Sequence, residues 1–198
     1  MQLLNALEIQ HPMLDRINGR LVREVDRLVD LMEDILLIGK AQTSNLKVEP
    51  EEFSVVSLID DIANDIGQIT DDGRMLRISK VGDSVNFTGD YDLLRHAIIN
   101  VVTNAFKYSP GQPNPELKLD FSNVDYICIS VRDFGIGIAT QEHERIFNDF
   151  YRGNNVKDIP GTGLGMSITR EFLKLNNCTI NVESELGLGS TFHVKLPK

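Results

Sequence analysis

The chain has 198 residues, of which 41% are hydrophobic, 25% charged and 7% aromatic, and its net charge is −9. This length and composition predict a globular protein with a packed core, built as one domain with an appendage or as two small domains. The negative charge argues against a nucleic-acid-binding protein, and no apolar run approaches the roughly 20 residues of a membrane span. The two cysteines, Cys128 and Cys178, lie far apart and indicate neither a disulfide framework nor a metal cluster. We therefore expect a soluble, cytoplasmic protein.

Residues 1–45 are expected to be mainly one long helix. Leu14, Leu21, Leu28 and Ile35 recur every seven residues, and further apolar residues flank them on both sides. A stripe of this width suits a helix of a bundle rather than a two-stranded coiled coil. Because a lone amphipathic helix cannot bury such a stripe, it must pair with a second copy or with the body of the protein.

Residues 46–198 show a mixed pattern and are expected to form a second domain, after a polar linker over 39–50. Strands are predicted at 53–56, 75–81, 85–88, 117–121, 126–132, 179–183 and 191–196, and helices at 57–69, 91–108, 140–147 and 164–175. Long strands with helices gathered between them predict an α+β two-layer sandwich rather than a Rossmann repeat.

One helix carries a polar cluster beside its apolar face. Asn100 and Asn104 are one turn apart and share a face. A side-chain amide oxygen is a hard, neutral ligand suited to Mg²⁺ that takes its remaining ligands from water and phosphates. Lys107 and Tyr108 follow one turn later, within reach of phosphate or ribose oxygens. The simpler interpretation is a helix with two solvent-facing or capping asparagines.

Three glycine-containing clusters follow. Asp133 ends a predicted strand, where its carboxylate can accept a hydrogen bond from an amine such as adenine N6, with two glycines close behind it. The run 161–165 opens a helix, so its backbone N–H groups and the helix dipole offer a phosphate site. It matches neither the Walker nor the dinucleotide-binding pattern. The run 187–192 is explained mostly by a glycine hairpin, with Thr191 as an additional ligand contact.

Taken together and in this order, these clusters resemble the sequence boxes of sensor histidine kinases. Residues 100–110 are similar to the N box, 133–138 to the G1 box, 146–153 to the F box, 161–168 to the G2 box and 189–192 to the closing glycine box. The resemblance extends over residues 12–198. It implies the Bergerat ATP-binding fold, which DNA gyrase B, MutL and a heat-shock chaperone share, with ATP and Mg²⁺ as cofactors.

The resemblance also implies a role for individual residues. Asp133 would bind the adenine amine, Asn104 would hold Mg²⁺ and Lys107 would meet phosphate. Arg152 would lie at the edge of an ATP lid over 153–160. The nucleotide-site residues expected in full are Asn100, Asn104, Lys107, Tyr108, Asp133, Gly135, Gly137, Ile138, Phe150, Arg152, Gly161, Thr162, Gly163, Leu164, Gly165 and Thr191, with Asn100, Asn104 and Lys107 as the catalytic group.

One position separates a kinase from a hydrolase. Related ATPases carry a water-activating glutamate one turn before the Mg²⁺ asparagine, and here that position is Asn100. An amide cannot act as a base near neutral pH, so ATP would be kept for transfer of its γ-phosphoryl to a histidine. The resemblance thus implies an ATP-dependent protein-histidine kinase. Its N-terminal helix would pair with a second copy, and a response-regulator aspartate would receive the phosphoryl group.

The sequence departs from the family pattern in two ways. No histidine stands in the family's acceptor setting, since His11 precedes Pro12-Met13 and the remaining histidines lie inside the second domain. The acceptor, together with the membrane spans and sensor domain of most relatives, is therefore expected outside this sequence. Asp149 stands where many relatives carry a basic residue. The alternatives are a true ATPase of the same fold and a degenerate nucleotide-binding regulatory module.

Overall fold

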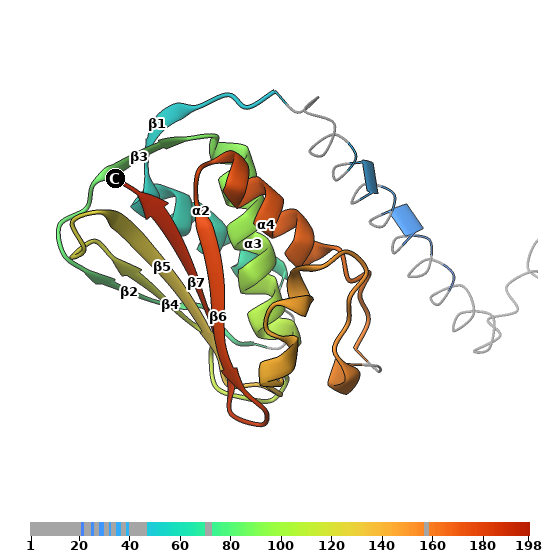
Figure 1. Cartoon of the computed structure of the whole chain (residues 1–198). Helices are drawn as coiled ribbons and strands as arrows, with labels where there is room; N and C mark the ends of the chain where they lie inside the picture. Colours follow the sequence, from blue (N-terminus) through green and yellow to red (C-terminus); the bar gives the residue numbers. More distant parts are fainter. Residues whose placement is uncertain are drawn as a thin grey trace, which may run out of the picture.

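The computed structural model arranges the chain in two layers, a β-sheet and a set of helices packed on one of its faces (Figure 1). It describes residues 47–69, 73–156 and 159–198, together with the single positions 21, 25, 28, 29, 32, 35, 36 and 39. The predicted α+β sandwich is confirmed. His11, the linker residues 40–46 and most of the expected N-terminal helix lie outside the described residues.

The main sheet has five strands in the order β2-β4-β5-β7-β6. They are β2 (Arg77–Val81), β4 (Glu116–Asp120), β5 (Tyr126–Asp133), β6 (Thr179–Glu185) and β7 (Gly189–Pro197). β2 and β4 are parallel, and the other neighbours are antiparallel. Along β5, every second residue is buried against the helices (Ile127, Ile129 and Val131), so the side chains between them point to the opposite face.

Three helices cover one face of this sheet: α2 (Val55–Ile69), α3 (Tyr91–Lys107) and α4 (Gly165–Leu175) (Figure 1). α3 packs against both α2 and α4. Asp90 caps its N-terminus by accepting a hydrogen bond from the backbone N–H of Leu93 at 3.0 Å. The buried residues of α3 recur three and four apart, as an amphipathic helix requires: Leu94, Ala97, Ile98, Val101, Val102, Ala105 and Phe106.

A two-stranded ribbon lies beside the ends of α3 and α4. It consists of β1 (Glu51–Ser54) paired antiparallel with β3 (Asn86–Gly89). Asp90 follows β3, and its backbone N–H donates to the side-chain oxygen of Asn176, the C-cap of α4, at 2.6 Å. The Asp90 carboxylate also accepts from the backbone N–H of Glu49 at 2.9 Å. The buried Asp90 thus ties the end of the linker to both helices.

The helix predicted over 140–147 is wrong, because the structure has two 3₁₀ turns there, η1 (Thr140–Glu142) and η2 (Arg145–Phe147). Glu142 and Phe147 are the buried side chains of these two turns, too few for the apolar face of an α-helix. The strand predicted at 53–56 also ends earlier, since Val55 begins α2. Within the described residues, no helix is long and apolar enough to cross a membrane.

Candidate functional site

A cleft of about 800 Å³ opens between α3, α4 and the loop that follows β5. Most of the site residues expected from the sequence line it: Asn100, Asn104, Lys107, Tyr108, Asp133, Gly137, Ile138, Arg152, Gly161, Thr162, Gly163 and Gly165. Gly135, Phe150, Leu164 and Thr191 are not among the lining residues. The tertiary structure therefore brings residues from four separate sequence boxes to one cavity.

One end of the cleft is built around a buried carboxylate. Asp133 is the last residue of β5 and is only 5% exposed. Its Oδ1 accepts a hydrogen bond from the backbone N–H of Gly135 at 2.8 Å. Burial raises the pKa of Asp133, and this effect is opposed by hydrogen bonds from Gly135 and from the backbone and hydroxyl of Ser190. A carboxylate in such a setting is a hydrogen-bond acceptor for a polar group that enters the cleft.

Ser190 is a cleft residue that the sequence reasoning missed. It faces Asp133 across the β5–β7 pair, whereas the next residue, Thr191, lies opposite Arg132. Because side chains alternate along a strand, Ser190 and Thr191 point to opposite faces of the sheet. The strand register, which the sequence does not reveal, decides which hydroxyl reaches the site.

Gly135 serves the packing of the loop rather than the lining of the cleft. A Cβ at this position would lie 2.0 Å from the carbonyl oxygen of Tyr108 at the end of α3. The same carbonyl accepts the backbone N–H of Ile136 at 3.2 Å. The loop after β5 is thereby held against the C-terminus of α3, which keeps Asp133 at a fixed place beside that helix.

The wall between α3 and α4 carries the two asparagines. The Asn100 Nδ2 group donates to the hydroxyl oxygen of Thr169 at 2.8 Å, and Thr169 is fully buried. The Asn104 Nδ2 group faces the sulfur of Met166 at 3.4 Å. Both amide nitrogens are therefore directed at α4, which leaves the amide oxygens for other partners. Neither Thr169 nor Met166 was among the site residues expected from the sequence.

The part of the cleft wall where α4 begins is suited to an anion. α4 begins at Gly165 without a side-chain cap, so the positive end of its dipole opens into the cleft. Leu164, the residue before α4, is buried in the core. The Lys107 amine lies beside Gly161, in the loop that leads to α4. A Cβ built on Gly161 would be 2.9 Å from Lys107 Nζ. The combination of helix terminus and ammonium group favours bound phosphate.

The segment after η2 borders the cleft and is stabilised by hydrogen bonds within the segment. The Arg152 guanidinium donates to the carbonyl oxygen of Val156 at 2.7 Å and also to that of Ile159. Phe150, with a positive φ of 59°, is 63% exposed and is not among the lining residues. Residues 157 and 158 of the expected lid lie outside the described residues.

Glu142 is a further cleft residue that the sequence reasoning missed. It is 4% exposed and accepts hydrogen bonds from the Tyr151 hydroxyl at 2.7 Å and the Asn154 amide at 3.3 Å. Asn155 in turn donates to the carbonyl oxygen of Gly137 at 2.9 Å. These bonds join the candidate lid to the loop that carries Asp133. No sequence box marked Glu142, because its partners come together only in the folded loop.

A two-layer sandwich with this cleft is a nucleotide-binding architecture, and comparison with known proteins identifies its class. Residues 89–198 match the family described as histidine kinase-, DNA gyrase B-, and HSP90-like ATPase. The match covers more than half of the chain, and the chain belongs to this family. The predicted Bergerat fold and family resemblance are thereby confirmed.

The relatives specify the branch of the family. The sensor histidine kinase RcsC of Escherichia coli (strain K12) is 32% identical over 189 residues, which are 93% of this chain and 20% of RcsC. The phosphate regulon sensor protein PhoR of Pseudomonas aeruginosa is 30% identical over 193 residues, which are 96% of this chain and 43% of PhoR. The chain thus spans less than half the length of these two relatives. The chain is similar to these sensor proteins over a region that includes its histidine kinase-like ATPase domain.

Solved structures of histidine kinases share the fold. ShkA in complex with AMPPNP superposes with a TM-score of 0.77 at 23% identity, over 92% of this chain and 38% of ShkA. The Acinetobacter baumannii histidine kinase AdeS superposes with a TM-score of 0.72 at 19% identity, over 98% of this chain and 88% of AdeS.

Proposed function

We propose that this chain binds ATP with Mg²⁺ in the cleft between α3 and α4 and transfers the γ-phosphoryl group to a histidine. The observation that carries the proposal is that the buried Asp133 and the uncapped N-terminus of α4 line the same cleft. A carboxylate acceptor suits the adenine amine, and a helix terminus beside Lys107 suits the phosphates. The nucleotide would therefore lie along α3, past the two asparagines.

The donor set on α3 fits Mg²⁺. Since Nδ2 of Asn104 faces the Met166 sulfur, its Oδ1 is the atom that would hold the cation. Among the described residues, no three His, Cys, Asp or Glu side chains converge on a metal position. A cation here would take most of its ligands from phosphate and water, as Mg²⁺ bound with a nucleotide commonly does. The bound cation would neutralise charge on the phosphates.

Asn100 supports phosphoryl transfer to a protein side chain over hydrolysis. Its Nδ2 is held by Thr169 at 2.8 Å, and an amide at this position cannot take a proton from water near neutral pH. ATP would be positioned without rapid hydrolysis until an acceptor histidine reaches the γ-phosphate in line. The alternative of a true ATPase predicts steady release of inorganic phosphate from the chain alone.

The acceptor and the further partners belong to the same proposal. We place the acceptor histidine outside residues 1–198, with a response-regulator aspartate as the next recipient. The helical positions Leu21, Val25, Leu28, Met32 and Ile35 are apolar and exposed, which supports pairing of residues 1–45 with a second copy in a helical bundle. Residues 46–198 would then be the ATP-binding catalytic domain of a cytoplasmic kinase core.

The test is a calorimetric titration of the full chain with Mg²⁺ and the non-hydrolysable analogue AMPPNP, with and without Asp133→Asn. Loss of the charged acceptor is expected to weaken binding by tenfold or more, corresponding to about 1.5–3 kcal/mol. Asp83→Asn, an exposed aspartate in the loop before β3, is the matched control and should bind normally. Equal affinity in Asp133→Asn would remove Asp133 from the adenine site.

Two further measurements address the reaction. Asn104→Ala is expected to abolish the Mg²⁺ dependence of AMPPNP binding, and retained dependence would move the metal site elsewhere. Incubation with ATP and a helical hairpin that carries a family-type acceptor histidine should give an acid-labile phosphoryl label on that hairpin. Binding without any label would favour the regulatory module, and steady phosphate release would favour the ATPase.

A further inference from the structure

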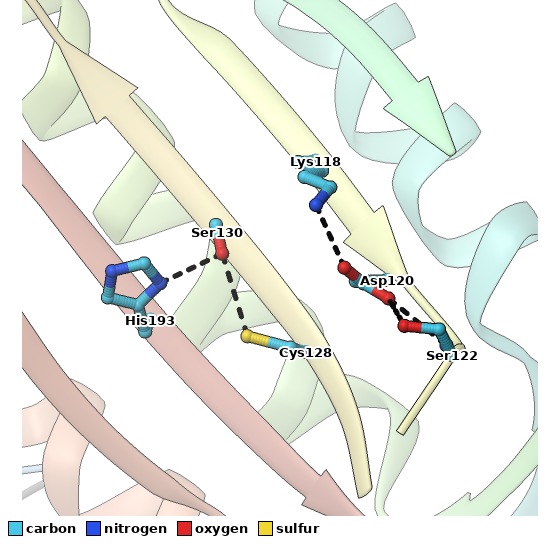
Figure 2. A network of polar contacts seen from close by, with 6 residues as sticks. All are labelled: Lys118, Asp120, Ser122, Cys128, Ser130 and His193. Carbon is cyan, nitrogen blue, oxygen red and sulfur yellow. Dashed lines mark hydrogen bonds and ion pairs between the residues drawn. The ribbon is translucent and has the colours of Figure 1, made fainter. Parts of the chain in front are cut away.

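A cluster of nucleophilic and titratable side chains lies on the face of the sheet opposite the helices. Cys128 and Ser130 project from β5, and His193 projects from the neighbouring β7 (Figure 2). Residues on either side of them in β5, such as Ile129, are buried against the helices, so these three point away from the nucleotide cleft. The cluster is therefore separate from the site described above.

The three side chains form a continuous polar chain. The Cys128 sulfur lies 3.5 Å from the Ser130 hydroxyl oxygen, which lies 2.9 Å from Nδ1 of His193 (Figure 2). On the far side of the imidazole, Nε2 of His193 is buried and has no hydrogen-bond partner among the described residues. It lies 3.8 Å from a carboxylate oxygen of Glu183. The imidazole thus stands between a thiol–hydroxyl pair and a carboxylate, an arrangement that favours its charged form.

The charges around the thiol favour the thiolate. The nearby His193 imidazole, joined to Cys128 through Ser130, lowers the pKa of Cys128, burial opposes this, and Ser130 and Lys195 add to the lowering. Reciprocally, Cys128 raises the pKa of His193, against burial and with help from Glu183. The titratable or charged groups on this face of the cluster's own and neighbouring strands are Glu116, Lys118, Asp120, Tyr126, Arg132, Glu183 and Lys195. Lys118 pairs with Asp120 at 2.8 Å, which leaves Lys195 as the cation that acts on the thiol.

We propose that Cys128 is a site of oxidation by hydrogen peroxide to a sulfenic acid, activated by Ser130 and His193. The thiol proton passes through the Ser130 hydroxyl to Nδ1 of His193. The thiolate sulfur attacks one peroxide oxygen, so that an S–O bond forms and the O–O bond breaks. The leaving hydroxide takes a proton from the imidazolium and departs as water. The sulfur is oxidised to a sulfenic acid, and the peroxide is reduced.

The chain contains its own control in Cys178. This second thiol is 5% exposed, and burial raises its pKa to about 12. It is therefore expected to react with neither alkylating agents nor peroxide in the folded chain. Cys128 is only half-buried, on the face of the sheet opposite the helices, and is expected to react with a small reagent. A single proteolytic digest of one treated sample therefore gives the extent of modification at both cysteines.

The first test measures the rate at which iodoacetamide alkylates the full chain between pH 5 and 10. The second treats the chain with peroxide and traps sulfenic acid with dimedone. Both are read by mass spectrometry of peptides. The Cys128 rate profile should have its midpoint below the usual thiol value of about 8.5, and Cys128 should carry the dimedone adduct. A midpoint at or above that value, or no adduct on Cys128, would overturn the proposal.

Variants test whether the reactivity of Cys128 depends on Ser130 and His193 or only on the exposure of its thiol. His193→Gln should lower the Cys128 rate at pH 7 by about three- to tenfold and shift the midpoint upward, because the thiolate fraction falls. Ser130→Ala should act in the same direction, while Ser130→Thr should retain the native rate. His143→Gln removes an imidazole outside the cluster and should change nothing. Far-ultraviolet circular dichroism checks that each variant is folded, and equal rates in native and folded His193→Gln chains would refute the role of the imidazole.

Discussion

Removal of the Thr169 hydroxyl tests whether α4 orients the Asn100 amide of α3. Thr169→Val keeps the shape of this fully buried side chain and deletes the oxygen that lies 2.8 Å from Asn100 Nδ2. The remaining neighbour of that nitrogen is the Met166 sulfur at 3.9 Å, too far for a strong bond. The amide would be left without a good acceptor.

The magnitude follows from the burial of the two groups. An unsatisfied polar group costs about 1–3 kcal/mol, and the lower end applies because Asn100 is half-buried and borders the cleft. For a chain of this size, 1 kcal/mol lowers the thermal midpoint by about 2–4 °C. Because the Asn100 amide would also be free to rotate, affinity for Mg²⁺ and AMPPNP should fall together with stability.

The assays are thermal unfolding by circular dichroism and calorimetric titration with AMPPNP. Thr169→Ser is the matched control, because it keeps the hydroxyl and loses one methyl group. It should retain native nucleotide affinity while losing about 1 kcal/mol of stability through packing. If Thr169→Val has the same midpoint and the same affinity as the native chain, the orienting role of Thr169 is refuted.

Three further predictions concern other parts of the fold. Gly165→Ala should destabilise the chain by about 1–3 kcal/mol, because its Cβ would lie 2.7 Å from Asn100 Oδ1. Gly67→Ala should instead stabilise α2 by about 0.5–1 kcal/mol, because its Cβ would have no atom within 4 Å. Equal urea midpoints for the two variants would contradict this. AMPPNP binding should weaken as pH falls, with a midpoint above the usual aspartate value of about 4, because burial raises the pKa of Asp133 and the carboxylate form is the acceptor. Titrations at stepped pH check this, and a midpoint at or below 4 speaks against it. Arg74→Met should lower the free energy of unfolding by about 1–3 kcal/mol, since the Arg74 guanidinium donates a hydrogen bond to the Ser109 carbonyl at the end of α3 at 2.7 Å. An unchanged denaturant midpoint would show that this hydrogen bond does not stabilise the fold.

Local pattern in the sequence was sufficient for most of the secondary structure. The alternation of apolar residues in 126–132 predicted β5, and the helix predicted over 91–108 is α3, since strand and helix patterns each arise from the geometry of a single element. The pattern failed over 140–147, where two 3₁₀ turns replace the predicted helix. That segment is held by contacts of Glu142 and Phe147 to other parts of the chain, which local periodicity does not register.

The sequence by itself also determined the class of protein, since the residues of the N, G1 and G2 boxes are short contiguous runs that each match a known pattern. Only the tertiary structure decided which neighbours those residues have. Ser190 rather than Thr191 reaches Asp133 because of the β5–β7 register, and Thr169 holds Asn100 because α4 packs against α3. The cluster of Cys128 and His193 exists for the same reason: it joins residues 65 positions apart, and strand pairing, unlike a sequence box, is set by contacts between distant parts of the chain.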